Sequence, residues 1–336
     1  MKKFMTIAAL ALASVMALTA CASSAPQATA PAQASAKGGM DGGSSLTFTT
    51  GGDQGTYYGF GGVLAGKIGE STSTTVTAIT SGGSKANIEA LQAGDAQIGF
   101  VQSDVMAYAY NGTRLFADGG AVTNFSTVAD LYLEQVQIVT LDPQIKTVAD
   151  LKGKNVSIGA AGSGVYFNAI DVLEAYGISE QDISPTYQSF GDSVESLVDG
   201  KIDAAFVVAG APTTAITGLV ATRDIYMISL DEEHINKLIE ASPYYSKTVI
   251  PKTAYNTQSD VTTVAVGAVV IARDDVSEAD VYNFLFGIFE NKDAITQAHS
   301  KGEELDLDFA ASVTSVPYHP GAVKYFKEKG KDVPAK

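Results

Sequence analysis

A glycine-rich stretch after the first strand-like run places the strongest constraint on the fold of this chain. The apolar run 46–48 is followed by residues 49–62, TTGGDQGTYYGFGG, which lead into an amphipathic segment. A strand that ends in glycines before a helix forms a loop whose backbone amides lie at a helix N-terminus, where anions bind. Two adjacent tyrosines suit a small organic ligand better than a polyphosphate. One wall of a ligand site is therefore expected at Gly51, Gly52, Tyr57 and Tyr58.

The strand–loop–helix order recurs along the chain, which is typical of an α/β fold with a mainly parallel sheet. Strands are expected at 46–50, 74–80, 96–101, 132–140, 155–159, 184–188, 204–208, 225–229 and 261–272. Helices are expected at 57–68, 85–92, 105–110, 166–176, 192–198, 232–241 and 277–290. Two long strands, 132–140 and 261–272, would join two sheets across a cleft, as in a hinged clamp. The predicted domains are lobe I, residues 46–138 and 256–336, and lobe II, residues 139–255.

Short polar residues follow the second and third strands of the first lobe. Ligands bind outside the carboxyl ends of strands in open parallel sheets, so these loops are candidate binding loops. Each loop alone is explained by N-capping, which these residue types favour. Together with the glycine-rich loop after the first strand, these make three such loops in succession, which favour a polar binding site instead. The candidates are Ser81, Ser84, Asn87, Gln102 and Asp104.

The second lobe repeats the pattern of the first. A second glycine-rich loop, residues 160–165, follows the strand 155–159 and precedes a helix. A turn at 209–212 follows the buried strand 204–208. These loops would close on a ligand from the opposite side, and their candidate residues are Ser163, Gly164, Val165, Tyr166 and Gly210.

Composition and motif spacing argue against several functions. The net charge of -15 and the lack of a basic patch argue against nucleic-acid binding. Three scattered histidines and one cysteine suggest no metal site. The glycine spacing before the first helix does not give G-x-G-x-x-G, so no nucleotide cofactor is expected. Residue 161 is alanine, so the G-x-S-x-G pattern of a nucleophile elbow also fails. We expect no enzyme activity.

The N-terminus predicts export and anchoring. A basic start precedes the apolar run 6–18, which is too short to span a bilayer and is typical of a signal peptide, residues 1–20. The residues 18–21, LTAC, resemble a bacterial lipobox, and Cys21 is the only cysteine of the chain. We expect a lipid on Cys21, a flexible tether over residues 21–45, and a location facing the periplasm or cell exterior.

An ordered set of short motifs extends from about residue 46 to about residue 330. They are TGG (50–52), GTYY (55–58), GS (83–84) with Asn87, FVQSD (100–104), DLKGK (150–154), GSG (162–164) and PYHPGA (317–322). In this order they resemble the TAXI family, the extracytoplasmic solute receptors of tripartite ATP-independent periplasmic (TRAP) transporters. The resemblance implies a two-lobed, type II-like periplasmic-binding-protein fold with two hinge strands and a central ligand cleft.

The resemblance also implies a ligand and roles for the loops. The ligand would be a small carboxylate or amino acid, similar to glutamate or 2-oxoglutarate, delivered to a TRAP membrane permease. Ser81, Ser84 and Asn87 would hold one carboxylate, while Gln102 and Asp104 would bind the other polar end. The family often has threonine and an acidic residue where this chain has Val165 and Tyr166. This difference leaves a ligand with a more apolar portion open.

Two alternatives remain at this point. A substrate-binding lipoprotein of an ABC importer would share the fold and the tether and would differ only in its membrane partner. A secreted α/β hydrolase is the alternative from another functional class, but no strand-end loop combines a nucleophile with a base at a known spacing.

Overall fold

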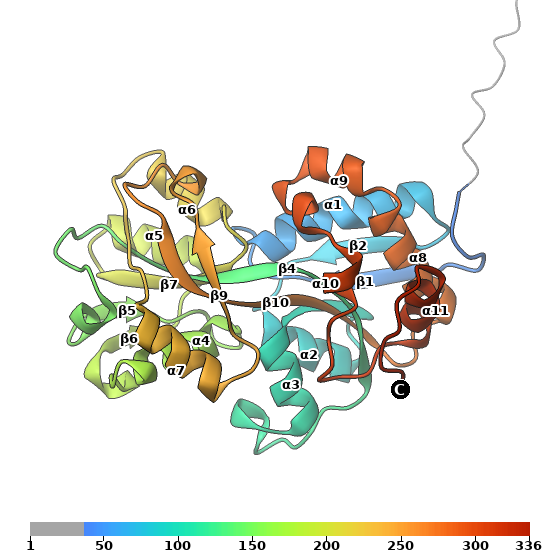
Figure 1. Ribbon diagram of the computed structural model, residues 1–336, viewed down its shortest axis with the longest axis horizontal. Coiled ribbons are helices and arrows are strands. Elements are labelled where there is room, and N and C mark those ends of the chain that lie inside the picture. The colour runs from blue at the N-terminus through green and yellow to red at the C-terminus, as the bar shows by residue number, and fades with distance from the viewer. Residues whose placement is uncertain (1–36) are drawn as a thin grey trace, which may run out of the picture. The chain divides into compact units, whose positions relative to one another are not determined.

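One ten-stranded sheet runs through the part of the chain that the computed structural model describes, residues 37–336 (Figure 1). Its main strand order is β2-β1-β3-β10-β4-β7-β5-β6, with β8 paired to β4 and β9 paired to β10. The strands are β1 Ser45–Thr49, β2 Thr75–Ile79, β3 Ile98–Gln102, β4 Phe125–Thr140, β5 Asn155–Ser157, β6 Ser184–Thr186, β7 Ala204–Ala209, β8 Tyr226–Met227, β9 Ser246–Ile250 and β10 Val261–Arg273.

The long strands β4 and β10 connect the two lobes. They pair with each other antiparallel, and β10 also pairs with β3 while β4 pairs with β7. Their apolar runs are buried almost throughout, because the side chains of both strands pack into the apolar clusters that cover the faces of the sheet. The two predicted sheets are thus two ends of one continuous sheet. The predicted α/β, two-lobed fold is confirmed, with β4 and β10 as the connecting strands.

Lobe I is the part built around β1, β2 and β3, which pair in parallel. Its core is rich in aromatic side chains, with Phe48 tilted against Phe100 and edge-on to Phe284. The helices of this lobe are α1 Thr56–Ser71, α2 Ser84–Ala93, α3 Ser103–Asn111, α8 Glu278–Phe289, α9 Lys292–Ala298, α10 Leu307–Ala310 and α11 Pro320–Glu328, with short 3₁₀ turns η1 Arg114–Phe116 and η5 Ser300–Glu304.

Lobe II is the part built around β5, β6 and β7, with apolar clusters on both faces of the sheet. Helices α4 and α7 cover one face, and α5 and α6 cover the other (Figure 1). These helices are α4 Val165–Ala175, α5 Phe190–Val198, α6 Thr214–Val220 and α7 Glu232–Ala241, with 3₁₀ turns η2 Val148–Leu151, η3 Glu180–Asp182 and η4 Lys252–Ala254. Two apolar faces explain why β7 reads as a continuous hydrophobic run.

Most predicted elements are found within a few residues of their expected bounds. The main differences are that β4 begins at residue 125 instead of 132, and that the edge strand β9 and the elements after residue 290 were not predicted. The predicted lobe boundaries fall inside β4 and just before β10 and stay a prediction, because the described residues form one compact unit.

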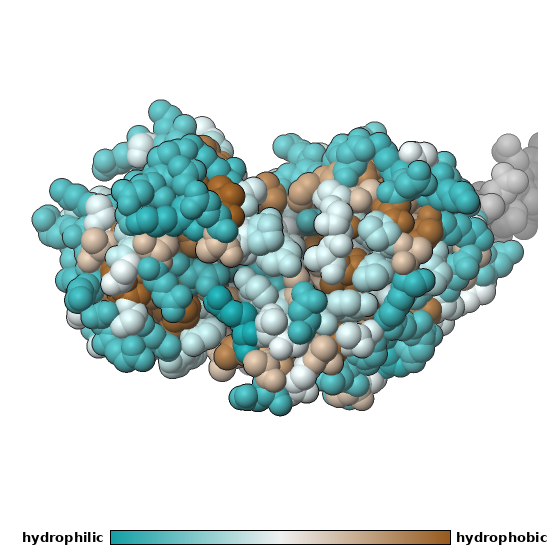
Figure 2. Space-filling view, turned by 60° about the horizontal axis from the view of Figure 1, so that its bottom comes forward, coloured by the Kyte–Doolittle hydropathy of each residue, from teal (hydrophilic) through white to brown (hydrophobic). Residues whose placement is uncertain are grey.

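The first described residues lie against lobe I. In residues 38–44, which the sequence places in the tether, Gly38 donates to the Ser71 carbonyl and Met40 donates to Asn283. The described residues do not include the predicted signal peptide, Cys21 or the part of the predicted tether up to residue 36. Across 37–336, no helix is both long enough and apolar enough to cross a membrane. The face in Figure 2 is mainly hydrophilic on both lobes and is indented between them.

Candidate ligand-binding site

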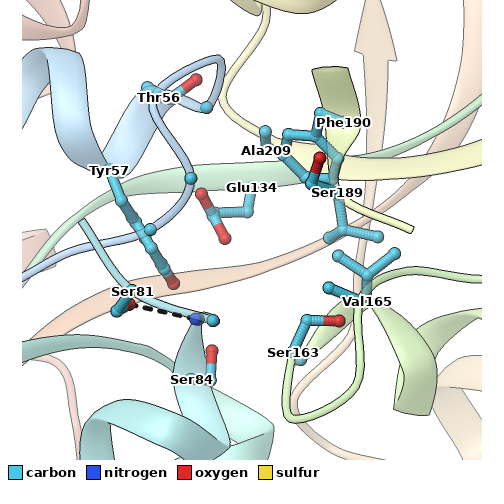
Figure 3. A pocket seen from close by; sticks show the side chains of 18 of the residues that line it. Thr56, Tyr57, Ser81, Ser84, Glu134, Ser163, Val165, Ser189, Phe190 and Ala209 are labelled. Atoms are coloured by element: carbon cyan, nitrogen blue, oxygen red, sulfur yellow. Dashed lines mark hydrogen bonds between the residues drawn. The ribbon is translucent and has the colours of Figure 1, made fainter. Parts of the chain in front are cut away.

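A partly open cavity of about 80 Å³ lies between the two lobes (Figure 3). At roughly 10–15 Å³ of such volume per water molecule, it has room for about five to eight waters. Both lobes line it, through the loops that follow β1, β2, β3, β5, β6 and β7 and through one side chain of β4. The lining residues are Gly51, Gly52, Gly55, Thr56, Tyr57, Ser81, Gly82, Gly83, Ser84, Gln102, Glu134, Ala160, Ser163, Gly164, Val165, Gln188, Ser189, Phe190, Val208 and Ala209.

Hydrogen bonds to backbone carbonyls hold the lobes together beside this cavity. The Thr56 hydroxyl donates to the carbonyl of Gly210 at 2.7 Å. The Ala86 amide of α2 donates to the carbonyl of Gly162 at 3.1 Å. These hydrogen bonds hold the two lobes against each other beside the cavity.

The N-termini of several helices reach the cavity. Three of these helices, α1, α2 and α4, begin after the glycines Gly55, Gly83 and Gly164, and none of the three has a side-chain cap. In contrast, α7 and α8 are capped by Asp231 and Ser277. Uncapped helix N-termini carry partial positive charge and unsatisfied amides, so the cavity favours an anionic group.

Tyr57 and Tyr58 differ although they are adjacent. Tyr57 is buried and stacks parallel on Phe100, with ring centroids 4.6 Å apart. Burial, followed by the nearby Glu134 carboxyl, raises the pKa of Tyr57 well above its ordinary value, so the hydroxyl stays neutral. Tyr58 is 38% exposed because it occupies the next position around helix α1. Tyr57 alone lines the cavity.

Several polar atoms of the lining have no hydrogen-bond partner. The hydroxyl of Ser163, the Tyr57 hydroxyl and the side-chain carbonyls of Gln102 and Gln188 are buried and unpartnered. An unsatisfied buried polar atom costs about 1–3 kcal/mol. Their concentration in one cavity indicates that a bound solute completes the hydrogen bonding there.

Among the residues that the structure describes, Glu134 supplies the only carboxyl group of this lining. It comes from β4, where that strand passes from β10 to β7, and its side chain is almost fully buried between Tyr57 and lobe II (Figure 3). Its Oε1 accepts a hydrogen bond from the Tyr132 hydroxyl at 3.3 Å. Burial raises the pKa of Glu134 from its ordinary 4.5 to about 8, so the carboxyl is protonated at neutral pH.

Buried Lys301 lies behind the cavity and does not enter it. Its ammonium pairs with Glu304 and sits over the ring of Tyr132. Among the described residues that line the cavity, there is no lysine, arginine or histidine. The electrostatics of the site therefore come from the helix N-termini and from Glu134.

Nine of the fourteen predicted site residues line the cavity, and five do not. Those in the lining are Gly51, Gly52, Tyr57, Ser81, Ser84, Gln102, Ser163, Gly164 and Val165. Among the other five, Asn87 donates to two backbone carbonyls, and Asp104 and Tyr166 bond to Asn168 and Glu180. The remaining two are Tyr58, which is exposed, and Gly210, whose carbonyl accepts from Thr56.

Two parts of the lining were not predicted from the sequence. The predicted strand 184–188 ends at Gln188 and no role was assigned to residues 189–190, but Ser189 caps α5 and brings Phe190 to the cavity. Glu134 was hidden inside the predicted strand 132–140. An acidic residue within an otherwise buried strand was the signal that could have identified it.

A second group of polar side chains joins the lobes outside the cavity. We call it the interlobe cluster, and it comprises Asp104, Arg114, Asn168, Asp171 and Tyr245. Arg114 pairs with Asp171 at 2.5 Å, and Asn168 donates to Asp104 at 3.0 Å. The Tyr245 hydroxyl donates to Asp171 and accepts from Asn168. Burial raises the pKa of Asp104 to about 7.

Comparisons with known proteins agree with this architecture. The model of the NMT1-like family matches residues 48–330. A structure titled as a periplasmic transporter is 13% identical, with a TM-score of 0.54, and the match covers 84% of this chain and 92% of that one. A protein from Bordetella bronchiseptica RB50 is 17% identical, with a TM-score of 0.51 over 84% and 88% of the two chains. An amino acid ABC transporter substrate-binding protein from Streptococcus pneumoniae is 14% identical, with a TM-score of 0.46 over 77% and 95%.

Proposed function

Because the chain belongs to the NMT1-like family, we propose that it is an extracytoplasmic solute-binding receptor that captures a small carboxylate or amino acid by lobe closure. One observation carries this proposal: the cavity between the lobes is bounded by uncapped helix N-termini and by buried polar atoms without partners. Such a site gains affinity from fixed donors and from exclusion of water, and it needs no chemical step.

The membrane partner is open between two classes. The motif resemblance supports delivery to a TRAP permease. An ABC importer is an equal candidate, because its receptor would share this fold and would differ only in the membrane partner. Co-purification of the receptor with the permease encoded beside its gene, tested with and without solute, distinguishes the two partners.

The hydrolase alternative receives little support from the site. The cavity contains serines, but Ser81 accepts from the Gly83 amide, and Ser84 accepts from the Gln102 amide. In the described lining, no serine has a histidine beside it to act as a general base.

The lipid anchor on Cys21 and the location outside the cytoplasm are part of the proposal. We expect the wild-type protein to fractionate with membranes and a Cys21→Ala variant to lose the diacylglycerol mass. Intact-protein mass spectrometry of both variants measures this directly. A wild-type mass without lipid would contradict the anchor and would leave the receptor function standing.

Solute binding is tested by native mass spectrometry of the freshly purified protein, followed by thermal melting with carboxylates, amino acids and alkanesulfonates. A solute at 100 times its Kd stabilises the folded state by about 2.7 kcal/mol. We expect one solute per chain and a rise in Tm. Turnover of any compound, or no shift across the whole panel, would contradict the receptor function.

A further inference from the structure

The cavity combines two kinds of electrostatic environment. Helix N-termini of α1, α2 and α4 converge on it without side-chain caps, and each of these helices has ten or more residues. This part of the lining attracts an anion. Within the described lining, a group that attracts a cation is present at one point, where the Glu134 carboxyl extends from β4 toward the cavity (Figure 3).

Resting on the proposed receptor function, we infer that Glu134 is the subsite for an ammonium group and that the solute is an amino acid. Its carboxylate faces the uncapped helix N-termini, and its ammonium faces Glu134. Glu134 is thus a specificity-determining residue that selects amino acids over acids of the same shape that lack the amine.

The hydrogen-bonding state of the lining supports an ammonium. An ammonium has three donors and no acceptor. The side-chain carbonyls of Gln102 and Gln188 are buried and lack donors. Glu134 accepts a weak bond from Tyr132 at 3.3 Å, and the Tyr57 hydroxyl also lies beside its carboxyl group. A simple carboxylate brings only acceptors and would leave these oxygens unsatisfied.

No protein cation takes the place of that ammonium. The ammonium of Lys301 is nearest among the described groups, but it is already paired with Glu304. The titratable and charged groups that face Glu134 are Tyr57 from α1, Asp104 from α3, Asp130 and Tyr132 from β4, and Lys301 from η5. Lys301 is the one cation in this set, so Glu134 stays protonated until a ligand cation arrives.

The lobe II side of the cavity defines the rest of the solute. Val165, Phe190, Val208 and Ala209 form an apolar wall there. The cavity volume of about 80 Å³ corresponds to a compact molecule. Small amino acids with an apolar side chain therefore fit better than long or doubly charged ones.

Matched pairs of ligands test the inference by isothermal titration calorimetry at pH 7. The probes are L-alanine with propionate, L-valine with isovalerate, and L-glutamate with glutarate. We expect at least one amino acid to bind, and to bind about 100-fold more tightly than its partner without the amine. An acid that binds as tightly as its amino acid would overturn the inference and leave the receptor function intact.

Proton release gives a second, independent readout. Binding of an ammonium ionises Glu134, so close to one proton moves to the buffer at pH 7, and the apparent enthalpy differs between phosphate and Tris buffers. A ligand carboxylate that accepted a hydrogen bond from protonated Glu134 would release none. Absence of release on binding of an amino acid therefore overturns the inference.

The variant Glu134→Gln keeps the shape of the protonated carboxyl, so it is expected to fold. We expect it to lose at least 100-fold in amino-acid affinity and to abolish the proton release. Glu240→Gln, an exposed change on α7, is the matched control and should alter neither. Unchanged binding by Glu134→Gln would overturn the inference. Failure of all six probes and of the wider panel would overturn the receptor function as well.

Discussion

The cavity and the interlobe cluster are both buried polar regions between the same two lobes, but they differ in how their groups are satisfied. In the cluster, each side chain has at least one protein partner, such as Arg114 with Asp171, although one oxygen each of Asp104 and Asn168 is buried without a partner. In the cavity, the hydroxyls of Tyr57 and Ser163 have none. The cluster therefore stabilises closure by itself, whereas the cavity becomes favourable only when a solute fills it.

The largest expected effect is a fall in the stability of the solute-free protein as the pH rises. Glu134 and Asp104 have pKa values of about 8 and about 7 in the folded protein, against 4.5 and 3.8 ordinarily. The folded state holds these protons where the unfolded chain has released them, so the free energy of unfolding decreases from about pH 4 to pH 8. We expect a loss of roughly 2–4 kcal/mol for each carboxyl, measured by urea unfolding across this range.

Two single variants can separate the contribution of the cavity to this pH dependence from that of the interlobe cluster. Glu134→Gln should remove the part that arises in the cavity, and Asp104→Asn the part that arises in the cluster. A saturating amino acid should abolish the Glu134 part and leave the Asp104 part in place. An equal response of both parts to the solute would show that the two regions do not differ in this way.

The next largest effect is expected from Gly164→Ala, which alters the contact between the lobes in the cavity. A Cβ at Gly164 would lie 1.7 Å from Oε1 of Gln102 in lobe I, while the backbone at Gly164, with φ near -71°, accepts alanine. We expect solute affinity to fall about 100-fold, or about 2.7 kcal/mol. Calorimetry measures the loss, and Gly218→Ala, in open space on α6, is the control. Recovery of closure in the double variant with Gln102→Ala, seen by small-angle scattering, checks the cause.

A smaller effect is expected from Asp171→Asn in the interlobe cluster. The Arg114 side chain is 38% exposed, so its ion pair with Asp171 contributes only about 0.2–1 kcal/mol to closure. Solute affinity should therefore fall by no more than about fivefold. Asp199→Asn breaks the exposed pair with Lys201 inside lobe II and should change nothing. A loss as large as that of Gly164→Ala would mean that the cluster belongs to the binding site.

Much of the fold follows from the sequence because periodicity and glycine position are local signals. The strand-end loops were placed correctly, since the carboxyl ends of parallel strands meet at one edge of a sheet. Which residue of a loop points inward was harder to predict. Tyr57 and Tyr58 are equivalent in the sequence, and the packing of Tyr57 on Phe100 makes only one of them part of the lining. Asn87 was predicted for a ligand but serves the backbone carbonyl of Thr50.

Glu134 could not be placed from local pattern alone. It lies in a strand, not in a loop. Its position depends on how β4 pairs, first with β10 and then with β7, and this pairing joins segments that are far apart in the sequence. The family resemblance implied that Gln102 and Asp104 bind the second polar end of the ligand. The structure places Asp104 in the interlobe cluster, bonded to Asn168, and leaves Glu134 as the carboxyl of the cavity lining.

A similarly small effect is expected from a pair of serine variants in lobe II. The Ser163 hydroxyl is unpartnered in the cavity, whereas the Ser157 hydroxyl bonds to that of Ser193 at 2.8 Å. Ser163→Ala should weaken solute binding by about 0.5–1.5 kcal/mol without lowering the stability of the solute-free protein. Ser157→Ala should lower stability by a similar amount and leave affinity unchanged. Urea unfolding and calorimetry on both variants measure the two quantities. If Ser163→Ala instead destabilised the solute-free protein and left affinity unchanged, its hydroxyl would be structural, and the contrast between satisfied and unsatisfied groups would not hold.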